Sequence, residues 1–367
     1  MNSLSLTDRF DPVGPNETAF LGKAIETSIS GQSSIVSYYE DQLREHFGVR
    51  EAIAVSSGFG ALVVALSAMG LEPGDKVLLT PTCPLCTAYA LTFMRLEPVF
   101  CDICRDDFSM SVDHAAFRLD SMTRAIIDIP MWGYPIAADA TEKFAKEHKL
   151  QFLVDVALAH QTKLHGQFLC KYAGAATFST HSSKNIVTGE GGVVLTDDPN
   201  LASKARKFCH PNNPQSANPG LNYALGGLQA ALGVSRLPRL ESDVVHRQAI
   251  MRHITNGLDN PHLEVLPITT GGTPGGTKLI VREVSGNNRQ LLRHQLDHGV
   301  PSDIANYNCK PLYEYPVFYD RSVSCPNAEK MLQSITTIPV HPEVDFETAN
   351  EIIEILNSYR PAVKEGL

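Results

Sequence analysis

One lysine lies between a cluster of hydroxyl side chains and a glycine-rich turn. The segment THSSKN (180–185) carries Lys184, and TGEGG (188–192) follows after two further residues, leading into the apolar run GVVLTD. A GxxxxGK[ST] phosphate loop is excluded, because that order of residues is absent and no helix pattern begins at these glycines. A lysine partly buried among hydroxyls and backbone donors can have a lowered pKa and condense with an aldehyde. Lys184 is therefore a candidate covalent amine, with a solvated loop charge as the alternative.

A carboxylate ends another apolar segment. Asp155 follows QFLV (151–154), where a carboxylate is costly unless a cation faces it. The protonated ring nitrogen of a cofactor would be such a cation; a helix N-cap or a salt bridge to an arginine is the alternative. His160 follows five residues later, and a histidine in such a place is more often a hydrogen-bonded core residue than a catalyst.

A third candidate follows the apolar run AIAV. In SSGFGA (56–61), Ser57, Gly58 and Phe59 open a helix pattern whose free N–H groups suit a phosphate. Many Ser-Gly N-caps hold no ligand, so an ordinary helix start is the alternative. A phosphate cradle, a carboxylate for a ring nitrogen and an amine for an aldehyde together describe a pyridoxal phosphate site.

Short apolar runs alternate with amphipathic helix patterns from residue 51 to about 197. The runs are AIAVS (52–56), KVLLTP (76–81), PVFCDI (98–103), RAIIDIP (124–130) and QFLVDV (151–156), with helices predicted over 60–70, 87–95 and 137–149. This alternation indicates parallel βαβ units and an α/β sheet covered by helices on both faces. Because ligands collect at the carboxyl ends of such strands, we expect the three candidates, with the turn that begins at Trp132, to lie along one edge.

Length and composition narrow the class of protein. The chain has 367 residues, of which 43% are hydrophobic and 19% charged, and a formal net charge of −9. That charge argues against a nucleic acid partner. Neither a signal peptide nor an apolar membrane run is indicated, so a cytoplasmic protein is expected, and its eight cysteines are expected to be reduced.

The alternation of apolar runs and helix patterns changes along the chain, and these changes predict three structural parts. Residues 1–48 form an N-terminal helical segment, with two helices over 25–48, that caps the front of a large domain. Residues 49–240 form that large α/β domain, which would bind the cofactor. A Pro/Asn-rich loop (211–220) and a long helix pattern (225–258) interrupted at Pro238 follow, and residues 241–367 form a smaller α+β domain.

The order and spacing of these motifs resemble a known family. SSGFGALVVALSAMGLEPGDKVLLTP, RAIIDIPMWGYP, VDVALAH and FSTHSSKNIVTGEGGVVLTDD are similar to the DegT-type sugar aminotransferases, which are fold-type I pyridoxal phosphate enzymes. The resemblance covers nearly the whole chain. It implies a large domain with a mostly parallel seven-stranded sheet between helices, and a homodimer with the site at the interface.

The resemblance also implies roles for single residues. Lys184 would form the internal aldimine and Asp155 would pair with the pyridinium nitrogen. The implied phosphate ligands are Ser57, Gly58, Phe59 and Ser179, together with Asn222, which would reach the cofactor of the neighbouring subunit. The expected substrates are an amino acid donor and a keto-bearing acceptor such as a sugar or cyclitol.

The chain departs from the family pattern around the expected substrate. Leu158 stands where a polar residue is usual, and within PTCPLC (81–86) Cys83 and Pro84 replace the aromatic residue that stacks on the cofactor ring. Ala224 stands where an arginine is expected, and the segment 306–316 lacks the usual histidines. The residues expected to line the substrate are His160, Trp132, His181 and Tyr307.

Other interpretations stay open. The same residues could serve another pyridoxal phosphate reaction, such as elimination, decarboxylation or cyclisation, or a non-catalytic regulatory protein that keeps the cofactor. Cysteines 83, 86, 101 and 104 form C-x2-C-x14-C-x2-C, close to a zinc pattern, which would suit a zinc-stabilised binding module. No glycine follows either pair to form a knuckle, so thiols that are structural or line the site are favoured and no metal is predicted.

Overall fold

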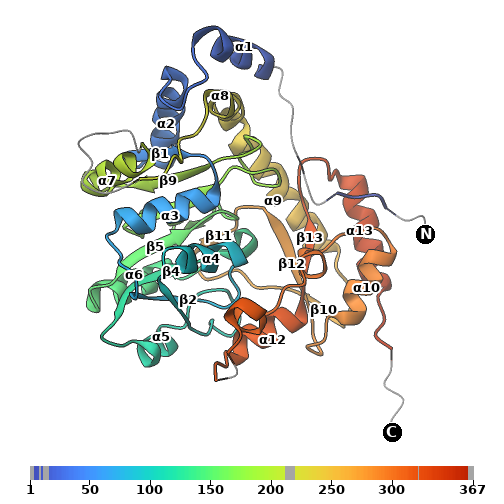
Figure 1. Cartoon of the computed structure of the whole chain (residues 1–367). Coiled ribbons are helices and arrows are strands. Elements are labelled where there is room, and N and C mark those ends of the chain that lie inside the picture. The colour runs from blue at the N-terminus through green and yellow to red at the C-terminus, as the bar shows by residue number, and fades with distance from the viewer. Residues whose placement is uncertain (1–3, 8–9, 11–15, 211–219, 321, 363–367) are drawn as a thin grey trace.

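A computed structural model describes residues 4–7, 10, 16–210, 220–320 and 322–362. Its centre is a seven-stranded sheet in the order β1-β9-β8-β5-β4-β2-β3 (Figure 1). The strands are β1 (Glu51–Val55), β2 (Lys76–Leu79), β3 (Glu97–Phe100), β4 (Thr123–Asp128), β5 (Gln151–Asp155), β8 (Ala175–Ser179) and β9 (Gly192–Thr196). Most of the predicted loop 211–220 lies outside the described residues.

All strands of this sheet except β9 run in the same direction. β2, β3, β4, β5 and β8 pair in parallel, whereas β9 is antiparallel to both β8 and β1. The mostly parallel α/β sheet predicted from the sequence is therefore confirmed. Consequently the carboxyl ends of β1, β2, β4, β5 and β8 lie along one edge, where the candidate residues follow them.

Helices cover the sheet, whose strands are mostly buried except for the edge strand β3. The helices in this part of the chain are α3 (Gly58–Ala68), α4 (Leu85–Phe93), α5 (Val112–Arg118), α6 (Ala138–Glu147) and α7 (Pro199–Cys209). α3 contacts β8, β9 and α7, and every residue from Gly60 to Leu66 is buried. A helix that is apolar on all sides is expected at such a place, between a sheet and other helices.

The N-terminal helices are α1 (Glu17–Thr27) and α2 (Ser34–Phe47). The predicted pair of helices is present, with the turn near Gly31, but α1 begins at residue 17 rather than 25. The guanidinium of Arg236 on α8 (Gly227–Arg236) pairs with Glu17 at 2.7 Å, which fixes α1 against α8. The sequence pattern misses these first eight residues of α1, whose partner Arg236 is remote in the chain.

The C-terminal part contains a second, antiparallel sheet. It consists of β10 (Leu263–Val265), β12 (Lys278–Glu283) and β13 (Ile335–Pro339). The helices are α9 (Leu240–Gly257), α10 (Arg289–Asp297), α11 (Asp303–Asn306), α12 (Pro326–Ser334) and α13 (Phe346–Ser358). A 3-10 turn, Leu237–Arg239, separates α8 from α9 at the predicted proline. The boundary at residue 240 between two domains stays a prediction.

A small three-stranded sheet links segments that are distant in the sequence. Its central strand, β6 (Lys163–Leu164), pairs with β11 (Gly272–Thr273) on one side and with β7 (Gln167–Phe168) on the other. This pairing holds the loop 271–277 against the segment that follows β5. None of the helices in the described part of the chain has the length and hydrophobicity needed to span a lipid bilayer.

Candidate active site

Asp155 is the last residue of β5, and its side chain is buried. One carboxylate oxygen accepts a hydrogen bond from the Thr87 hydroxyl at 2.9 Å, and the other accepts from the Ala157 amide at 3.1 Å. Burial raises the pKa of Asp155, while the Thr87 and Ala157 hydrogen bonds and the charge of Lys184 oppose this rise. A buried carboxylate with neutral donors and a nearby lysine is suited to hold a positively charged ring nitrogen.

Lys184 lies on a loop that leaves β8 and returns through β9. The loop is closed at its base, because the Thr180 amide donates to the Gly191 carbonyl at 2.9 Å and the Thr188 amide donates to the Thr180 carbonyl at 2.7 Å. A β-carbon on Gly191 would lie 2.4 Å from the Thr180 hydroxyl, so a glycine is required there. The glycines of TGEGG therefore allow the chain to pass close to Thr180 as it enters β9.

The backbone before Lys184 is held in an unusual conformation. Ser183 has a positive φ of 84°, which non-glycine residues rarely adopt, and the Lys184 amide donates to the His181 carbonyl at 3.2 Å. Burial lowers the pKa of the Lys184 ammonium, and nearby negative groups, among them Asp155 and Asp303, partly offset this effect. A larger fraction of its side chain is thus the neutral amine that bonds to carbonyl carbons.

Ser57, Gly58 and Ser179 meet where α3 begins. The Ser57 hydroxyl caps the helix by accepting from the Gly60 amide at 2.9 Å. A β-carbon on Gly58 would lie 2.6 Å from that of Ser179, so the end of β8 packs directly on the helix start. The amides of Gly58 and Phe59 have no acceptor within the helix, so this start can hold an anion. The Phe59 ring contacts Phe93 edge-on.

The segment that carries Asn222 runs beside this cradle. The Ser56 amide donates to the Tyr223 carbonyl at 2.7 Å, and Val55 forms a β-bridge with Ala224. Asn222 itself is exposed. The structure thus places Asn222 near the helix start and leaves it exposed to solvent.

His160 lies beneath the Lys184 loop. Its ring packs on Phe178 with centroids 4.6 Å apart, and its Nδ1 accepts a hydrogen bond from the Ile186 amide at 3.2 Å. Burial lowers the pKa of His160 to about 3, and the charge of Lys184 acts in the same direction. Its contacts with Ile186 and Phe178 place His160 against the base of the Lys184 loop.

Because His160 is buried as the neutral ring, it is expected to destabilise the fold in acid. In the unfolded chain it takes up a proton near pH 6.5, whereas in the fold it does so only near pH 3. Its contribution to stability is therefore lost as the pH falls below 6.5, at up to about 1.4 kcal/mol per pH unit. Between pH 7 and pH 5, the free energy of unfolding in urea should fall less for His160→Gln than for the wild type. An equal loss in both proteins would contradict the buried neutral ring.

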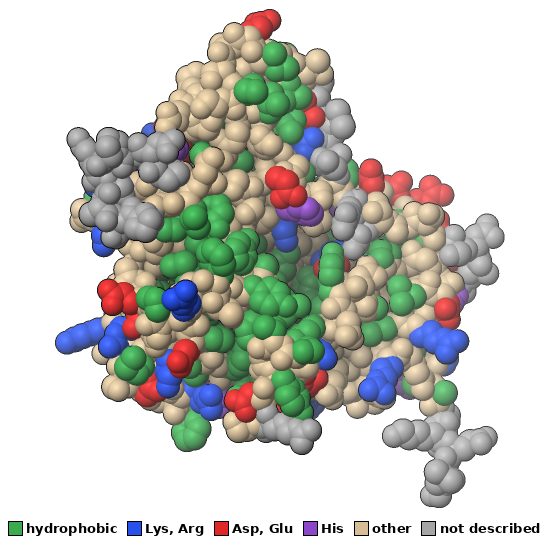
Figure 2. All heavy atoms as spheres, viewed as in Figure 1, with side chains coloured by type: hydrophobic (Ala, Val, Ile, Leu, Met, Phe, Trp, Pro, Cys, Tyr) green, Lys and Arg blue, Asp and Glu red, His purple; other side chains and the backbone are tan. Residues whose placement is uncertain are grey.

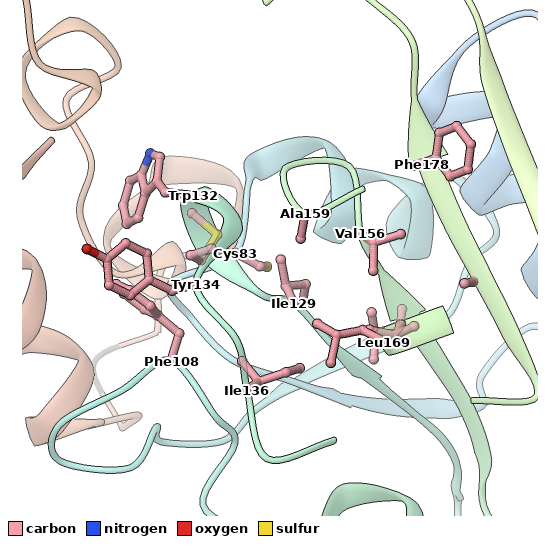
Figure 3. Close-up of a cluster of buried hydrophobic side chains, with 14 of the residues drawn as sticks. Cys83, Phe108, Ile129, Trp132, Tyr134, Ile136, Val156, Ala159, Leu169 and Phe178 are labelled. Carbon is pink, nitrogen blue, oxygen red and sulfur yellow. The ribbon is translucent and has the colours of Figure 1, made fainter. Parts of the chain in front are cut away.

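A cavity of about 380 Å³ collects most of the other candidates. Lys184, His181, Trp132, Tyr307, Leu158, Cys83 and Pro84 all line it. Hydrophobic side chains gather around a hollow in the middle of one face of the molecule (Figure 2). Trp132 and Cys83 lie near Phe108 and Tyr134 in the buried cluster of Figure 3, and the Phe108 and Trp132 ring centroids are 5.5 Å apart. The predicted Trp132 turn therefore reaches the site.

The local sequence around three residues of this site does not indicate that they belong to it. Thr87 orients Asp155 from α4, and Lys278 and Asp303 line the cavity from β12 and α11. Lys278 and Asp303 lie more than 90 residues beyond Lys184. Only the folding of the C-terminal part onto the main sheet brings them to the site.

The cysteines do not form a metal site in the described part of the chain, where no group of three or more histidine, cysteine or acidic side chains could hold a metal ion. Cys83 and Cys86 line the cavity. Cys101 and Cys104 instead donate weakly to the carbonyls of Val99 and Met110. All eight cysteines are free thiols.

The residues fit pyridoxal phosphate by the chemistry of their donors. The start of α3 offers backbone amides with the hydroxyls of Ser57 and Ser179 for a phosphate, and the buried Asp155 carboxylate suits a ring N–H. Lys184 supplies the amine for an aldehyde. Lys184 lines the cavity, and this cavity could hold a substrate next to the lysine.

Comparisons with known proteins give a consistent picture. The model of the DegT/DnrJ/EryC1/StrS aminotransferase family matches residues 16–357. The aminotransferase TlmJ from Streptoalloteichus hindustanus superposes with a TM-score of 0.90 at 23% identity, over 97% of this chain and 98% of TlmJ. DesI, solved in the presence of its TDP-sugar product, gives a TM-score of 0.89 at 24% identity, over 97% and 93% of the two chains.

A third structure shares the fold at lower identity. Spr1654 from Streptococcus pneumoniae, in its PLP form, gives a TM-score of 0.89 at 18% identity, over 97% of this chain and 98% of Spr1654. These likenesses confirm the predicted fold type I for the described chain.

Proposed function

The chain belongs to the DegT/DnrJ/EryC1/StrS aminotransferase family, and from this premise we propose that it uses pyridoxal phosphate to move an amino group from an amino acid to a keto-bearing sugar or related intermediate. The observation that carries the proposal is the meeting of Lys184, Asp155 and the start of α3 at one edge of the sheet. The TDP-sugar product of DesI, a protein of the same fold, supports a sugar-type acceptor.

The start of α3 would hold the phosphate, and Asp155 would hold the ring. Backbone amides of Gly58 and Phe59 and the hydroxyls of Ser57 and Ser179 present donors to an anion. Asp155, which Thr87 orients, would accept a hydrogen bond from the ring nitrogen and keep that nitrogen protonated. When bound, pyridoxal phosphate supplies an aldehyde that bonds to amines and a pyridinium ring that takes up an electron pair from a substrate carbon.

Lys184 has two tasks in this proposal. Its amine, whose neutral form is favoured because burial lowers its pKa, would hold pyridoxal phosphate at the aldehyde carbon, with the aldehyde oxygen leaving as water. With a substrate amine in that place, the Lys184 Nζ would be free to accept a proton from a substrate C–H bond and to donate it again. The closed loop base, Ser183 and the His160 contact to Ile186 hold the backbone of the loop, and Lys184 on this loop lines the cavity.

Transfer of an amino group from L-glutamate to the bound cofactor tests this function. The absorbance band of the bound cofactor near the visible-ultraviolet edge should shift to shorter wavelength on addition of the donor, with 2-oxoglutarate released in equal amount. No shift with any of a panel of amino acids would favour the regulatory alternative. Release of carbon dioxide, ammonia or another product in place of the keto acid would favour a different pyridoxal phosphate reaction.

The partner of this chain is proposed to be a second copy of itself. Tyr89 and Phe93 are exposed on one face of α4, and their neighbours are aromatic: Phe59 contacts Phe93, and Phe318 contacts Tyr89. Phe59 also belongs to the phosphate cradle, so this apolar patch continues into the site. A second subunit on the patch would exclude water from it and bring the partner's Asn222 toward the phosphate.

Replacing Phe93 with lysine is expected to separate the two subunits and weaken cofactor binding together. A charge in a buried apolar interface is costly, and the cofactor's phosphate would lose the donor from the second subunit. Light scattering measures the mass and cofactor titration measures the affinity. A wild-type monomer that binds the cofactor fully, or a Phe93→Lys dimer, would refute the proposed interface.

The division into a large domain, 49–240, and a smaller one, 241–367, is also part of the proposal. It is supported by the separate sheets, since the seven-stranded sheet ends at Thr196 and β10, β12 and β13 form their own. A cytoplasmic location is favoured by the free thiols of Cys86 and Cys104, which are exposed and would pair or oxidise in an oxidising compartment.

A further inference from the structure

Two side chains of opposite charge line the same cavity as Lys184. Lys278 is the first residue of β12 and Asp303 the first of α11, and the Lys278 Nζ lies 3.4 Å from an Asp303 carboxylate oxygen. Only 9% of the Lys278 side chain and 13% of the Asp303 side chain are exposed. A charge pair this deep interacts more strongly with a ligand than a surface pair does, because little water screens it.

The Asp303 carboxylate is fixed from two further directions. Its second oxygen accepts a hydrogen bond from the Trp132 indole N–H at 2.9 Å, and its backbone amide donates to the Thr337 hydroxyl at 2.8 Å. Trp132 is itself buried and packed edge-on against Phe108. The carboxylate therefore has a defined position between the large sheet and the C-terminal part.

Lys278 keeps donors that this pair does not use. An ammonium has three N–H groups. Within the described residues, Asp303 is the one acidic group within 4 Å of Lys278, and no hydrogen bond from its Nζ is formed there. At least one N–H is thus available to an oxygen atom that enters the cavity.

The other basic side chains of the cavity are less suited to this task. Lys184 is committed to the cofactor, and the His181 ring lies 3.6 Å from Glu190. Lys310 is only half-buried and lies over the Tyr315 ring, 4.8 Å from its centroid. Lys278 is the most deeply buried of these cations.

We propose that Lys278 binds the carboxylate of the amino acid donor and that Asp303 limits the strength of this binding. The inference rests on the proposed aminotransferase function. An amino acid carries its carboxylate on the same carbon as the amine that must reach Lys184, so the receptor for it has to line the same cavity, as Lys278 does. Asp303 competes for the Lys278 ammonium, so a donor can leave after its amine has been transferred.

The two residues are expected to have opposite effects when replaced. Lys278→Met removes the cation and should weaken binding of succinate, a dicarboxylate that cannot react, by roughly 10- to 100-fold. Asp303→Asn keeps an oxygen for the Trp132 N–H but removes the competing charge, so it should strengthen binding by about 2- to 10-fold. If the pair were purely structural, both replacements would weaken binding.

Isothermal titration of the purified holoenzyme with succinate measures these effects. Succinamide, which has the same shape without charge, should bind wild type and both variants equally. Lys278→Arg retains the cation and should stay within about 5-fold of wild type, which separates lost charge from misfolding. Weaker binding in Asp303→Asn, or a larger loss in Lys310→Met than in Lys278→Met, would overturn the proposal.

Separate kinetics for the amino donor and for the keto acceptor show which of the two substrates carries the carboxylate that Lys278 binds. Lys278→Met should raise the KM for L-glutamate by a similar factor while the rate at saturation changes less than 5-fold, and it should leave the KM of a neutral keto sugar unchanged. A raised KM for the acceptor alone would overturn the assignment to the donor. If the wild type transfers no amino group but the succinate pattern holds, the proposed function fails and the carboxylate site stands.

Discussion

Lys184→Ala is expected to lower the rate of amino transfer by roughly 10³-fold or more. The variant loses both the amine that bonds to the cofactor and the base that moves the substrate proton. The fold should survive, since Lys184 lies on a loop whose base is closed by Thr180, Thr188 and Gly191. Single-turnover absorbance with L-glutamate measures the rate, and circular dichroism checks the fold.

Two controls distinguish the role of Lys184 as an amine from the effect of its positive charge. Lys184→Arg keeps a cation of similar length, but a guanidinium does not deprotonate in proteins and cannot bond to an aldehyde, so this variant should be as inactive as Lys184→Ala. Added methylamine should restore part of the rate of Lys184→Ala, because a small free amine can enter the cavity and take the proton. Activity of Lys184→Arg near that of the wild type would mean that Lys184 acts only through its charge.

Asp155→Asn is expected to lower the same rate by roughly 10²- to 10³-fold, since a buried partner for a positive ring nitrogen is lost. The amide keeps the volume of the side chain and can still accept from the Thr87 hydroxyl. Thr87→Val, which leaves the charge and removes that hydrogen bond, should cost only about 3- to 10-fold. A rate within 3-fold of wild type in Asp155→Asn would remove Asp155 from the mechanism.

The same substitution should stabilise the cofactor-free protein at neutral pH. Burial raises the pKa of Asp155 above its value in the unfolded chain, so its contribution to stability is present at low pH and is lost as the pH rises through the raised pKa. Asparagine does not ionise and avoids this cost. Urea unfolding of the cofactor-free proteins should therefore show a higher free energy of unfolding for Asp155→Asn at pH 7, and a smaller difference at pH 4.

The sequence was sufficient for the parts of the site that lie at strand ends. Ser57, Asp155 and Ser179 each follow or end a short apolar run, and in a parallel sheet such positions share one edge. Their placement was therefore predictable from local patterns. The closed loop of Lys184 was partly predictable, because the glycines of TGEGG mark a return of the chain, although the close approach at Gly191 was not.

The remaining features depend on contacts between distant segments. Thr87 is one of many helix threonines, and only the packing of α4 against β5 turns its hydroxyl toward Asp155. Lys278 and Asp303 come from separate segments of the C-terminal part, and nothing in their neighbours marks them as a pair. His160 accepts a hydrogen bond from the Ile186 amide through its Nδ1, and the residues next to it in the sequence do not indicate this partner. No periodicity reports such contacts.

The central claim is that Lys184 is the residue that bonds covalently to the cofactor, and identifying the modified residue tests it most directly. The protein as purified is reduced with borohydride, digested, and the peptides are analysed by mass spectrometry for a pyridoxyl group. The account predicts the group on the lysine of the peptide that contains THSSKN, Lys184, and its loss together with the absorbance band in Lys184→Ala. A pyridoxyl group on Lys278 or Lys310, or a reducible band that persists in Lys184→Ala, would contradict it.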